Sequence, residues 1–173
     1  MTDKNSVKSF LEFMSVKEIV DENFQDYKKA SMFVCAKSCD FKCLTELNKN
    51  INICQNRRVS KMPDFDIKIS DIFDRYVSNI ITRSIVIGGL EPMLQINEVL
   101  SLINYFRKNN CPDDFVIYTG YYKHEIKKSI QKLQNFENII VKFGRFIPDS
   151  VPRYDNILGV ILSSENQYAE KIS

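Results

Sequence analysis

The chain has 173 residues, of which 44% are hydrophobic and 12% aromatic, so it is long enough and apolar enough to bury its own core. Its 24 Lys and Arg residues nearly balance 22 Asp and Glu residues, and a net charge of +2 provides no strong basic field for nucleic acid. No apolar run reaches the roughly 20 residues of a membrane span, and the N-terminus lacks the apolar core of a signal peptide. We therefore expect a single domain over residues 1–173, in the reducing cytoplasm and without a membrane partner.

The first third of the chain leads from a polar segment into a cysteine-rich loop. Residues 1–30 are polar, and the apolar residues of segment 16–24 are spaced as on one face of a short helix. Residues 31–35 (SMFVC) form a short apolar run, which predicts a buried strand. Residues 38–61 are polar and have no regular period, which is typical of a loop. A connection of this length inside a compact domain is usually functional.

Helical and strand patterns alternate through the rest of the chain. Helical stripes of apolar residues occur in the segments 66–79, 96–109 and 124–133. Short apolar strands are predicted at 83–87, 114–118 and 139–141, and a last apolar run occupies 157–162. This alternation predicts βαβ units and a parallel sheet, whose ligands collect at the carboxyl ends of the strands.

The five cysteines favour a metal site over a disulfide framework. They are Cys35, Cys39, Cys43, Cys54 and Cys111, an odd number, with four of them inside twenty positions. Because the chain has no CxxC pair, a closed structural zinc site is not indicated. Three thiolates that leave one metal position open would bind an exchangeable ligand. Simple packing as reduced thiols suits Cys111, and to a lesser degree Cys35, better than the three cysteines of the polar loop.

The loop resembles the cluster motif of radical S-adenosylmethionine proteins. The resemblance is to their short activating-protein branch, which includes the activase of the anaerobic ribonucleotide reductase and carries C-x3-C-x2-C, often with Asn two residues later. Cys39 and Cys43 (CDFKC) match the first half, and Cys54 with Asn56 (CQN) matches the end, but ten residues lie between them. A longer surface loop adds little closure entropy. An evenly spaced set of Cys35, Cys39 and Cys43 competes with this set, and the Gln-Asn after Cys54 favours the first.

Three further segments resemble the same branch. Residues 88–92 (GGLEP) resemble its Gly-Gly-Glu-Pro element with one extra residue. Residues 117–121 (IYTGY) and 163–167 (SSENQ) resemble its Tyr-Thr-Gly-Tyr and Ser-Ser-Asn-Gln segments. The resemblance covers residues 31–173. Residues 26–30 depart from it, because the Gly-Pro-Gly and Arg found there in many relatives are missing.

The resemblance implies an α/β fold built as a partial open (βα) barrel of parallel strands. It implies that Cys39, Cys43 and Cys54 hold a [4Fe–4S] cluster, with S-adenosylmethionine beside it. The cofactor-binding residues that it implies are Ile53, Gln55, Asn56, Gly88, Gly89, Glu91 and Thr119. In the family, one electron from the reduced cluster splits S-adenosylmethionine, and the resulting 5′-deoxyadenosyl radical abstracts a hydrogen atom.

The resemblance also implies an enzyme and its partners. The expected activity is that of an anaerobic oxidoreductase that installs a glycyl radical on an enzyme such as anaerobic ribonucleotide reductase. A low-potential donor such as flavodoxin or ferredoxin would reduce the cluster. Two alternatives stay open: radical chemistry on a small molecule, and a non-catalytic iron–sulfur or zinc module.

Overall fold

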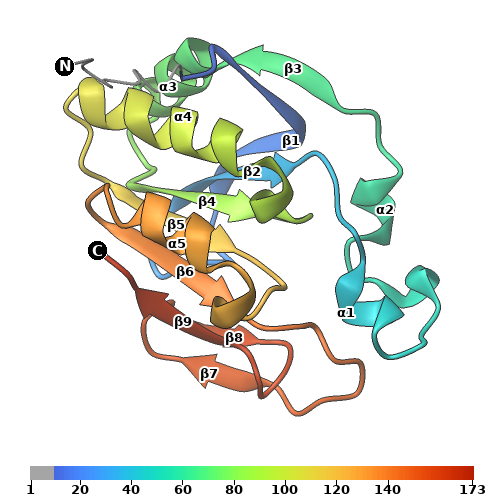
Figure 1. Ribbon diagram of the computed structural model, residues 1–173. Coiled ribbons are helices and arrows are strands. Elements are labelled where there is room, and N and C mark those ends of the chain that lie inside the picture. The colour runs from blue at the N-terminus through green and yellow to red at the C-terminus, as the bar shows by residue number, and fades with distance from the viewer. Residues whose placement is uncertain (1–9) are drawn as a thin grey trace, which may run out of the picture.

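The computed structural model describes residues 10–173 and is built on a seven-stranded sheet (Figure 1). The strands of this sheet are β1 (Phe13–Asn23), β2 (Ser31–Ala36), β3 (Phe65–Lys68), β4 (Ser84–Gly88), β5 (Asp114–Tyr118), β6 (Ile139–Phe143) and β9 (Tyr168–Lys171). Their order across the sheet is β3-β1-β2-β4-β5-β6-β9. Two further strands, β7 (Arg153–Asp155) and β8 (Val160–Leu162), form a separate hairpin.

The sheet is mixed, so the predicted open barrel of parallel strands is wrong. Strands β2, β4, β5 and β6 pair in parallel, whereas β1, β3 and β9 pair antiparallel with their neighbours. A parallel connection needs a crossover of a dozen or more residues, and the segment between β1 and β2 is too short for one. Antiparallel strands therefore border the parallel centre on both sides.

The helix predicted within segment 16–24 is also wrong, because residues 16–23 belong to β1. Met14 and Val16 alternate with more exposed neighbours and are themselves fully buried, which is the period of a strand. β1 pairs with β2 on one side and β3 on the other. Pairing with two neighbouring strands stabilises the extended backbone more than a short helical pattern of apolar residues stabilises a helix.

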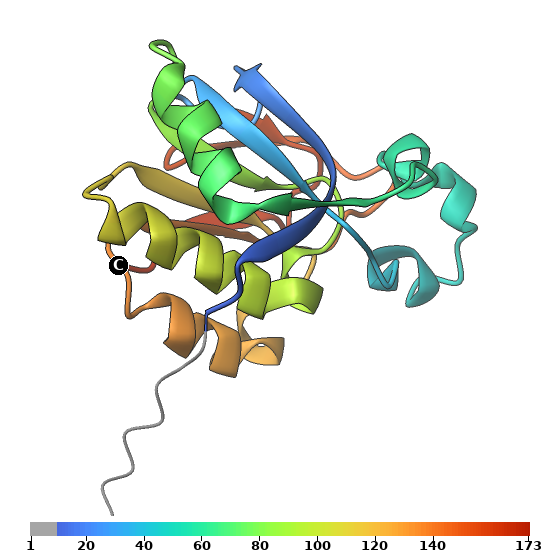
Figure 2. The same ribbon diagram turned by 90° about the horizontal axis from the view of Figure 1, so that it is seen from above.

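Three helices cover one face of the sheet (Figures 1 and 2). They are α3 (Ile69–Ser78), α4 (Ile96–Lys108) and α5 (Lys127–Leu133), and they precede β4, β5 and β6 in the chain. Alternate strand residues such as Ile85, Ile87 and Phe115 point into this core. Phe106 of α4 packs edge-on against Phe115, with ring centroids 5.2 Å apart. Among the described helices, none combines the length and apolarity needed to cross a bilayer.

The opposite face of the sheet is covered by a smaller core. Val86, Val116 and Ile140 point to this face, where they pack with Leu158 and Leu162 from the β7–β8 region. Because both faces are covered, the central strands are continuous apolar runs. This accounts for the successful prediction of strands near 83–87, 114–118 and 139–141.

The cysteine loop, residues 39–56, follows β2 and contains short helical turns that the sequence did not indicate. They are α1 (Lys42–Thr45) and the 3-10 turn η1 (Ile51–Ile53), and α2 (Arg57–Ser60) follows directly. Two other 3-10 turns, η2 (Pro92–Gln95) and η3 (Lys123–Glu125), lead into α4 and α5. In Figure 1 the loop lies on the side to which the arrows of β2 and β4 point.

Candidate metal centre

A cavity of about 390 Å³ opens where the parallel strands end. Its floor includes Phe33 of β2 and Tyr118 of β5, on the sheet face opposite to the three long helices. The cysteine loop and residues 160–163 form the walls. The carboxyl ends of parallel strands are the usual ligand site of such sheets, and the cavity lies there.

Cys39, Cys43 and Cys54 all line this cavity. Cys39 comes three residues after the end of β2, and its sulfur accepts a hydrogen bond from the backbone N–H of Phe41 at 3.3 Å. Phe41 adopts a left-handed backbone conformation, and α1 then brings Cys43 to the cavity. Cys54 ends η1, and its N–H donates to the carbonyl of Ile51 at 3.1 Å. Backbone turns therefore direct three thiols of one loop to one cavity.

Burial disfavours the thiolate form of two cysteines of the loop. Burial raises the pKa of the Cys39 thiol to about 12. Burial also raises the pKa of Cys43, and the neighbouring charge of Cys54 adds to this effect. Thiols held this way stay protonated in the apo protein, and coordination to iron would deprotonate them.

The thiols are not arranged around a single ion. Within residues 10–173, no three His, Cys, Asp or Glu side chains form a group that could hold one metal ion. In a [4Fe–4S] cluster each thiolate binds a different iron, so the three sulfurs need not surround a single ion. Three thiols that line one cavity therefore fit such a cluster.

The other two cysteines lie outside the cavity lining. Cys35 is 1% exposed at the end of β2, and its sulfur packs beneath Gly89. Cys111 packs against the main core and precedes β5, at the edge where the parallel strands begin. The choice of Cys54 over Cys35 as third ligand stays a prediction, and Cys54 is the one that shares the cavity.

Gly89 turns the chain sharply at the end of β4. Its φ of 73° is in the left-handed region, and the N–H of Leu90 donates to the carbonyl of Gly88 at 2.9 Å. A Cβ at Gly89 would lie 2.5 Å from the sulfur of Cys35. Glycine is therefore required at this position by packing under the turn as well as by backbone conformation.

Glu91 fixes the ends of two strands to each other. Its buried carboxylate accepts hydrogen bonds from the Thr119 hydroxyl at 2.7 Å, the Gly120 N–H at 2.8 Å and the Met93 N–H at 3.0 Å. Burial raises its pKa, although these hydrogen bonds act in the opposite direction. The predicted pairing of Glu91 with an ammonium group stays a prediction. Its protein contacts show that it also joins β4 to β5.

Most residues that the resemblance implies as ligands meet in this cavity. Its lining includes Cys39, Cys43, Cys54, Gln55, Asn56, Gly89, Glu91 and Thr119. Two do not line it. Ile53 is 45% exposed in η1, and Gly88 lies within the sheet, where a Cβ would come within 3.0 Å of Tyr118.

Lys142 is a cavity residue that sequence reasoning missed. It is 6% exposed, and its ammonium donates to the Gly144 carbonyl at 3.1 Å and lies 5.8 Å from the centre of the Tyr118 ring. Burial lowers its pKa to about 8, although the nearby acidic groups of Glu91 and Cys43 oppose this shift. A lysine inside the apolar run IIVKF was the available signal, because such a residue is rarely buried without a partner.

Comparison with known families agrees with this geometry. The model of the family described as a 4Fe-4S single cluster domain matches residues 27–168. The chain belongs to this family. The 4Fe-4S single cluster domain is associated with radical S-adenosylmethionine-type proteins, and the match supports an iron–sulfur cluster as the cofactor. No curated protein matches the chain.

Proposed function

We propose that this 4Fe-4S single cluster domain is a radical S-adenosylmethionine enzyme. The observation that carries the proposal is the single cavity shared by the three loop cysteines and the ends of β4 and β5. Gly89 and Thr119 are far from the cysteines in sequence, and the fold gathers them beside the thiols. This arrangement provides a cluster site with a polar ligand site next to it.

Three thiolates would hold the cluster and leave one iron open to a ligand. When bound and reduced, the cluster would supply one electron for cleavage of the sulfonium C–S bond of S-adenosylmethionine, with methionine and a 5′-deoxyadenosyl radical as the products. The protein contributes binding, orientation and exclusion of water. Leu44, which is fully buried, and the turn at Phe41 fix the position of Cys43 in the loop.

Lys142 is the cation best placed to bind the methionine carboxylate of S-adenosylmethionine. It lines the same cavity as Cys43 and Gly89, and no carboxylate of the described residues forms an ion pair with it. A charge-assisted hydrogen bond to an anionic ligand would offset the cost of burying the ammonium. The aromatic residues Phe33 and Tyr118 provide apolar surface for the adenosine.

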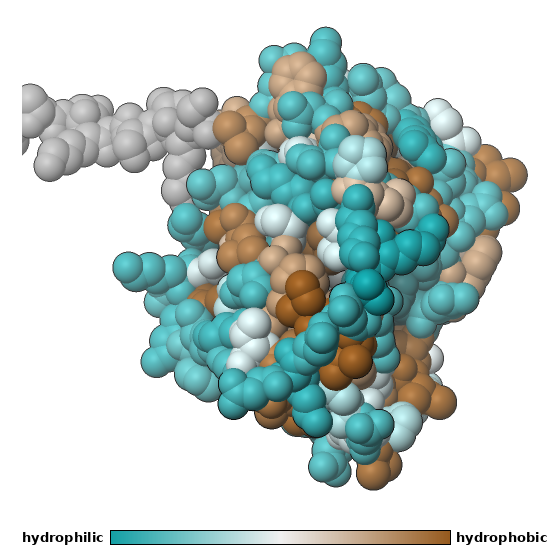
Figure 3. Space-filling view, turned by 90° about the vertical axis from the view of Figure 1, so that its right-hand side faces the viewer, coloured by the Kyte–Doolittle hydropathy of each residue, from teal (hydrophilic) through white to brown (hydrophobic). Residues whose placement is uncertain are grey.

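We further propose that the substrate is a protein, in the first place a glycyl-radical enzyme, and that a low-potential carrier such as flavodoxin or ferredoxin reduces the cluster. The support is a set of exposed apolar side chains, one at the cavity and three on the cysteine loop that forms part of its wall. Ile161 lines the cavity and is 70% exposed, and Leu47, Ile51 and Ile53 of the cysteine loop are 43%, 49% and 45% exposed. Figure 3 faces this side and shows brown, hydrophobic side chains between teal ones near its middle. An apolar rim with polar surroundings is typical of a protein-binding surface.

The decisive experiment is anaerobic reconstitution with iron and sulfide, followed by reduction and addition of S-adenosylmethionine. We expect the absorption of a [4Fe–4S] cluster and formation of 5′-deoxyadenosine. Cys54→Ala should lose most of its iron, whereas Cys35→Ala should keep it. A protein that binds the cluster but forms no 5′-deoxyadenosine would be a non-catalytic iron–sulfur module. Retention of iron by Cys54→Ala and its loss from Cys35→Ala would move the site to the evenly spaced cysteines.

A further inference from the structure

The cysteine loop has little apolar attachment to the rest of the protein. Of the ten residues between Cys43 and Cys54, only Leu44 is buried, and residues 45–53 are all exposed. A segment with few buried contacts opens easily. Polar contacts must therefore supply much of what holds this part of the loop.

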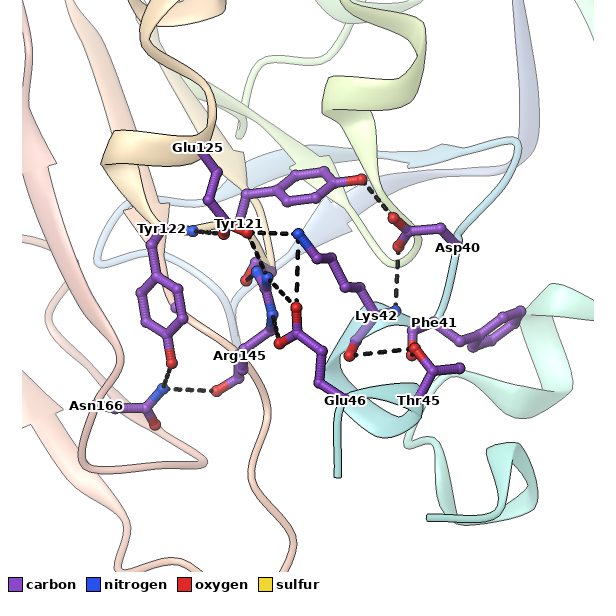
Figure 4. Close-up of polar contacts among 12 residues, drawn as sticks. Asp40, Phe41, Lys42, Thr45, Glu46, Tyr121, Tyr122, Glu125, Arg145 and Asn166 are labelled. Carbon is purple, nitrogen blue, oxygen red and sulfur yellow. Dashed lines mark hydrogen bonds and ion pairs between the residues drawn. The ribbon is translucent and has the colours of Figure 1, made fainter. Parts of the chain in front are cut away.

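Three charged residues of the cysteine loop contact side chains from the segments that follow β5 and β6 (Figure 4). Asp40 accepts a hydrogen bond from the Tyr121 hydroxyl at 2.5 Å, and the Lys42 ammonium pairs with Glu125 at 2.5 Å. Glu46 accepts two hydrogen bonds from Arg145, at 3.0 and 3.1 Å. All the partners lie after β5 or β6, beside the candidate centre.

Arg145 is the centre of this network. Its side chain is 5% exposed and lies 5.4 and 5.0 Å from the ring centres of Tyr121 and Tyr122. Besides Glu46, its guanidinium donates to Glu125 at 2.7 Å and to the carbonyl of Gly120 at 2.5 Å. The forked guanidinium thus binds the loop with one edge and the body of the protein with the other.

The backbone N–H and carbonyl of Gly120 connect Arg145 to Glu91, which lines the cavity. The carbonyl of Gly120 accepts from Arg145, and its N–H donates to Glu91, which lies two residues after Gly89. A continuous set of hydrogen bonds therefore runs from the turn at the end of β4, through the end of β5, to the cysteine loop. Burial alone would lower the pKa of Arg145, but its hydrogen bonds to Glu46 and Glu125 raise it above the ordinary value.

We propose that Arg145 is a positioning residue that fixes the cysteine loop, and with it Cys43, against the ends of β5 and β6. Arg145 touches neither the cluster nor a substrate in this role, and it acts through Glu46 and Gly120. The inference rests on the loop cysteines as cluster ligands and is independent of S-adenosylmethionine chemistry. Its test therefore uses the protein without that cofactor.

The first measurement is hydrogen exchange of the apo protein with Arg145→Met. Loss of the forked contact should accelerate exchange in residues 40–53 by about tenfold or more, because hydrogen bonds to charged groups are among the stronger ones. Exchange in β4 and β5 should stay unchanged. Arg145→Lys keeps the charge but loses the fork, so it should give an intermediate rate. The matched control is Arg153→Met, since Arg153 is an exposed arginine on β7.

Glu46→Gln provides a second variant that leaves the body of the protein intact, because Glu46 lies on the exposed side of the contact. Like Arg145→Met, it should accelerate hydrogen exchange in residues 40–53. Combined with Arg145→Met, it should cause little further acceleration, because the contact is already lost. In the reconstituted protein, both variants should release iron to a chelator several times faster than the wild type and Arg153→Met.

Two results would overturn the proposal. Unchanged exchange in residues 40–53 of both Arg145→Met and Glu46→Gln would show that the network does not hold the loop. A uniform loss of protection that includes β4 and β5 in both variants would make it a part of overall stability. Failure to form 5′-deoxyadenosine would leave the proposal untouched, because neither measurement depends on it.

Discussion

Lys142 is the residue whose burial is hardest to explain by stability alone. Its pKa of about 8 shows that the fold disfavours its charged form, since an unperturbed lysine titrates near 10.5. Below pH 8 the protein therefore holds a buried ammonium that forms no ion pair with any described carboxylate, although Glu91 is near enough to act on its pKa. Natural proteins accept such a cost mainly at binding sites.

We predict that Lys142→Met separates ligand binding from folding. The affinity for S-adenosylmethionine should fall about 10- to 100-fold, since a hydrogen bond to a charged group contributes about 1.5–3 kcal/mol. Iron content should stay unchanged, and the apo protein should unfold at equal or higher urea concentration because a buried charge is removed. Anaerobic calorimetry and urea titration measure both effects, with the exposed Lys128→Met as control. Wild-type affinity in Lys142→Met would exclude the proposed carboxylate contact.

The turn at Gly89 leads to a second prediction about a single residue. Gly89→Ala should lower the free energy of unfolding of the apo protein, because a left-handed backbone costs an L-residue about 1–2 kcal/mol and the new Cβ meets the Cys35 sulfur. In a Cys35→Ala background the sulfur is gone, so the same substitution should cost less. A double-mutant cycle by urea denaturation measures this coupling. Additive effects would show that the contact beneath the turn contributes nothing.

Residues of the site differ in how visible they are in the sequence. Cys39, Cys54 and Gly89 stand in a polar loop or directly after an apolar run, where their chemistry is local and recognisable. Lys142 has a local signal, a lysine inside an apolar strand, but its place in the cavity depends on the fold. Arg145 has no such signal, because its partner Glu46 lies 99 residues away in the sequence. The guanidinium of Arg145 has a role only where the fold brings Glu46 beside it.

Among the elements, the cysteine loop and η3 are held together by ion pairs. Glu125 of η3 binds both Arg145 and Lys42, at 2.7 and 2.5 Å. The hydrogen bond from Arg145 is the main cause that lowers the pKa of Glu125 to about 2, from an ordinary value of 4.5. A carboxylate whose pKa is lower in the folded than in the unfolded protein stabilises the fold fully at pH values above its ordinary pKa. This contribution is lost as the pH falls toward the folded-state pKa of about 2.

We therefore predict that acid releases the cysteine loop between about pH 4.5 and pH 2. Pepsin, which is active in this range, should cut residues 41–53 of the apo protein increasingly fast as pH falls. In Glu125→Gln the loop should already be cut quickly at pH 4.5, and the rate should depend less on pH. Mass spectrometry of the early fragments locates the cuts. Equal cleavage of wild type and Glu125→Gln at pH 4.5 would show that Glu125 does not secure the loop.

The elements themselves were predictable where burial was complete. β4, β5 and β6 are buried on both faces, so their apolar runs are continuous and their ends are marked by glycine or Thr-Gly. β1 was misread because half-buried residues such as Ile19 extend its apolar pattern beyond strict alternation. Short edge strands such as β3 and β9 carry too few buried residues to be recognised without their partners.

At the scale of the whole molecule, the error in fold class has one physical origin. The helix–strand alternation after residue 66 correctly indicates parallel pairing, and it contains no information on what borders the sheet. Antiparallel β1 has a short connection to β2 and pairs with the distant β3, whereas β9 returns to β6 after segment 144–167, which contains the β7–β8 hairpin. The position of the cavity was still predictable, because it depends on the carboxyl ends of the parallel strands.

The cavity is open to solvent on its rim, and this observation bears on the proposed radical chemistry. A 5′-deoxyadenosyl radical must be kept from water and from stray hydrogen donors, and we propose that a partner protein covers the opening. Ile161, 70% exposed at the cavity, is the rim residue that such a partner would bury. A charge introduced there should weaken docking without altering the cluster or the cofactor site.

We predict that the reduced protein alone cleaves S-adenosylmethionine slowly and without a productive acceptor. Addition of the matching glycyl-radical enzyme should produce a stable protein radical, seen as a doublet by electron paramagnetic resonance, because a glycine Cα radical is stabilised by its flanking amides. Ile161→Asp should lower the radical yield severalfold while the slow cleavage by the isolated protein stays the same. Val77→Asp is the matched control, since Val77 is 53% exposed on α3, away from the cavity lining. Efficient turnover of a small molecule with no second protein would show instead that the open rim is a substrate entrance and that the chain completes its own site.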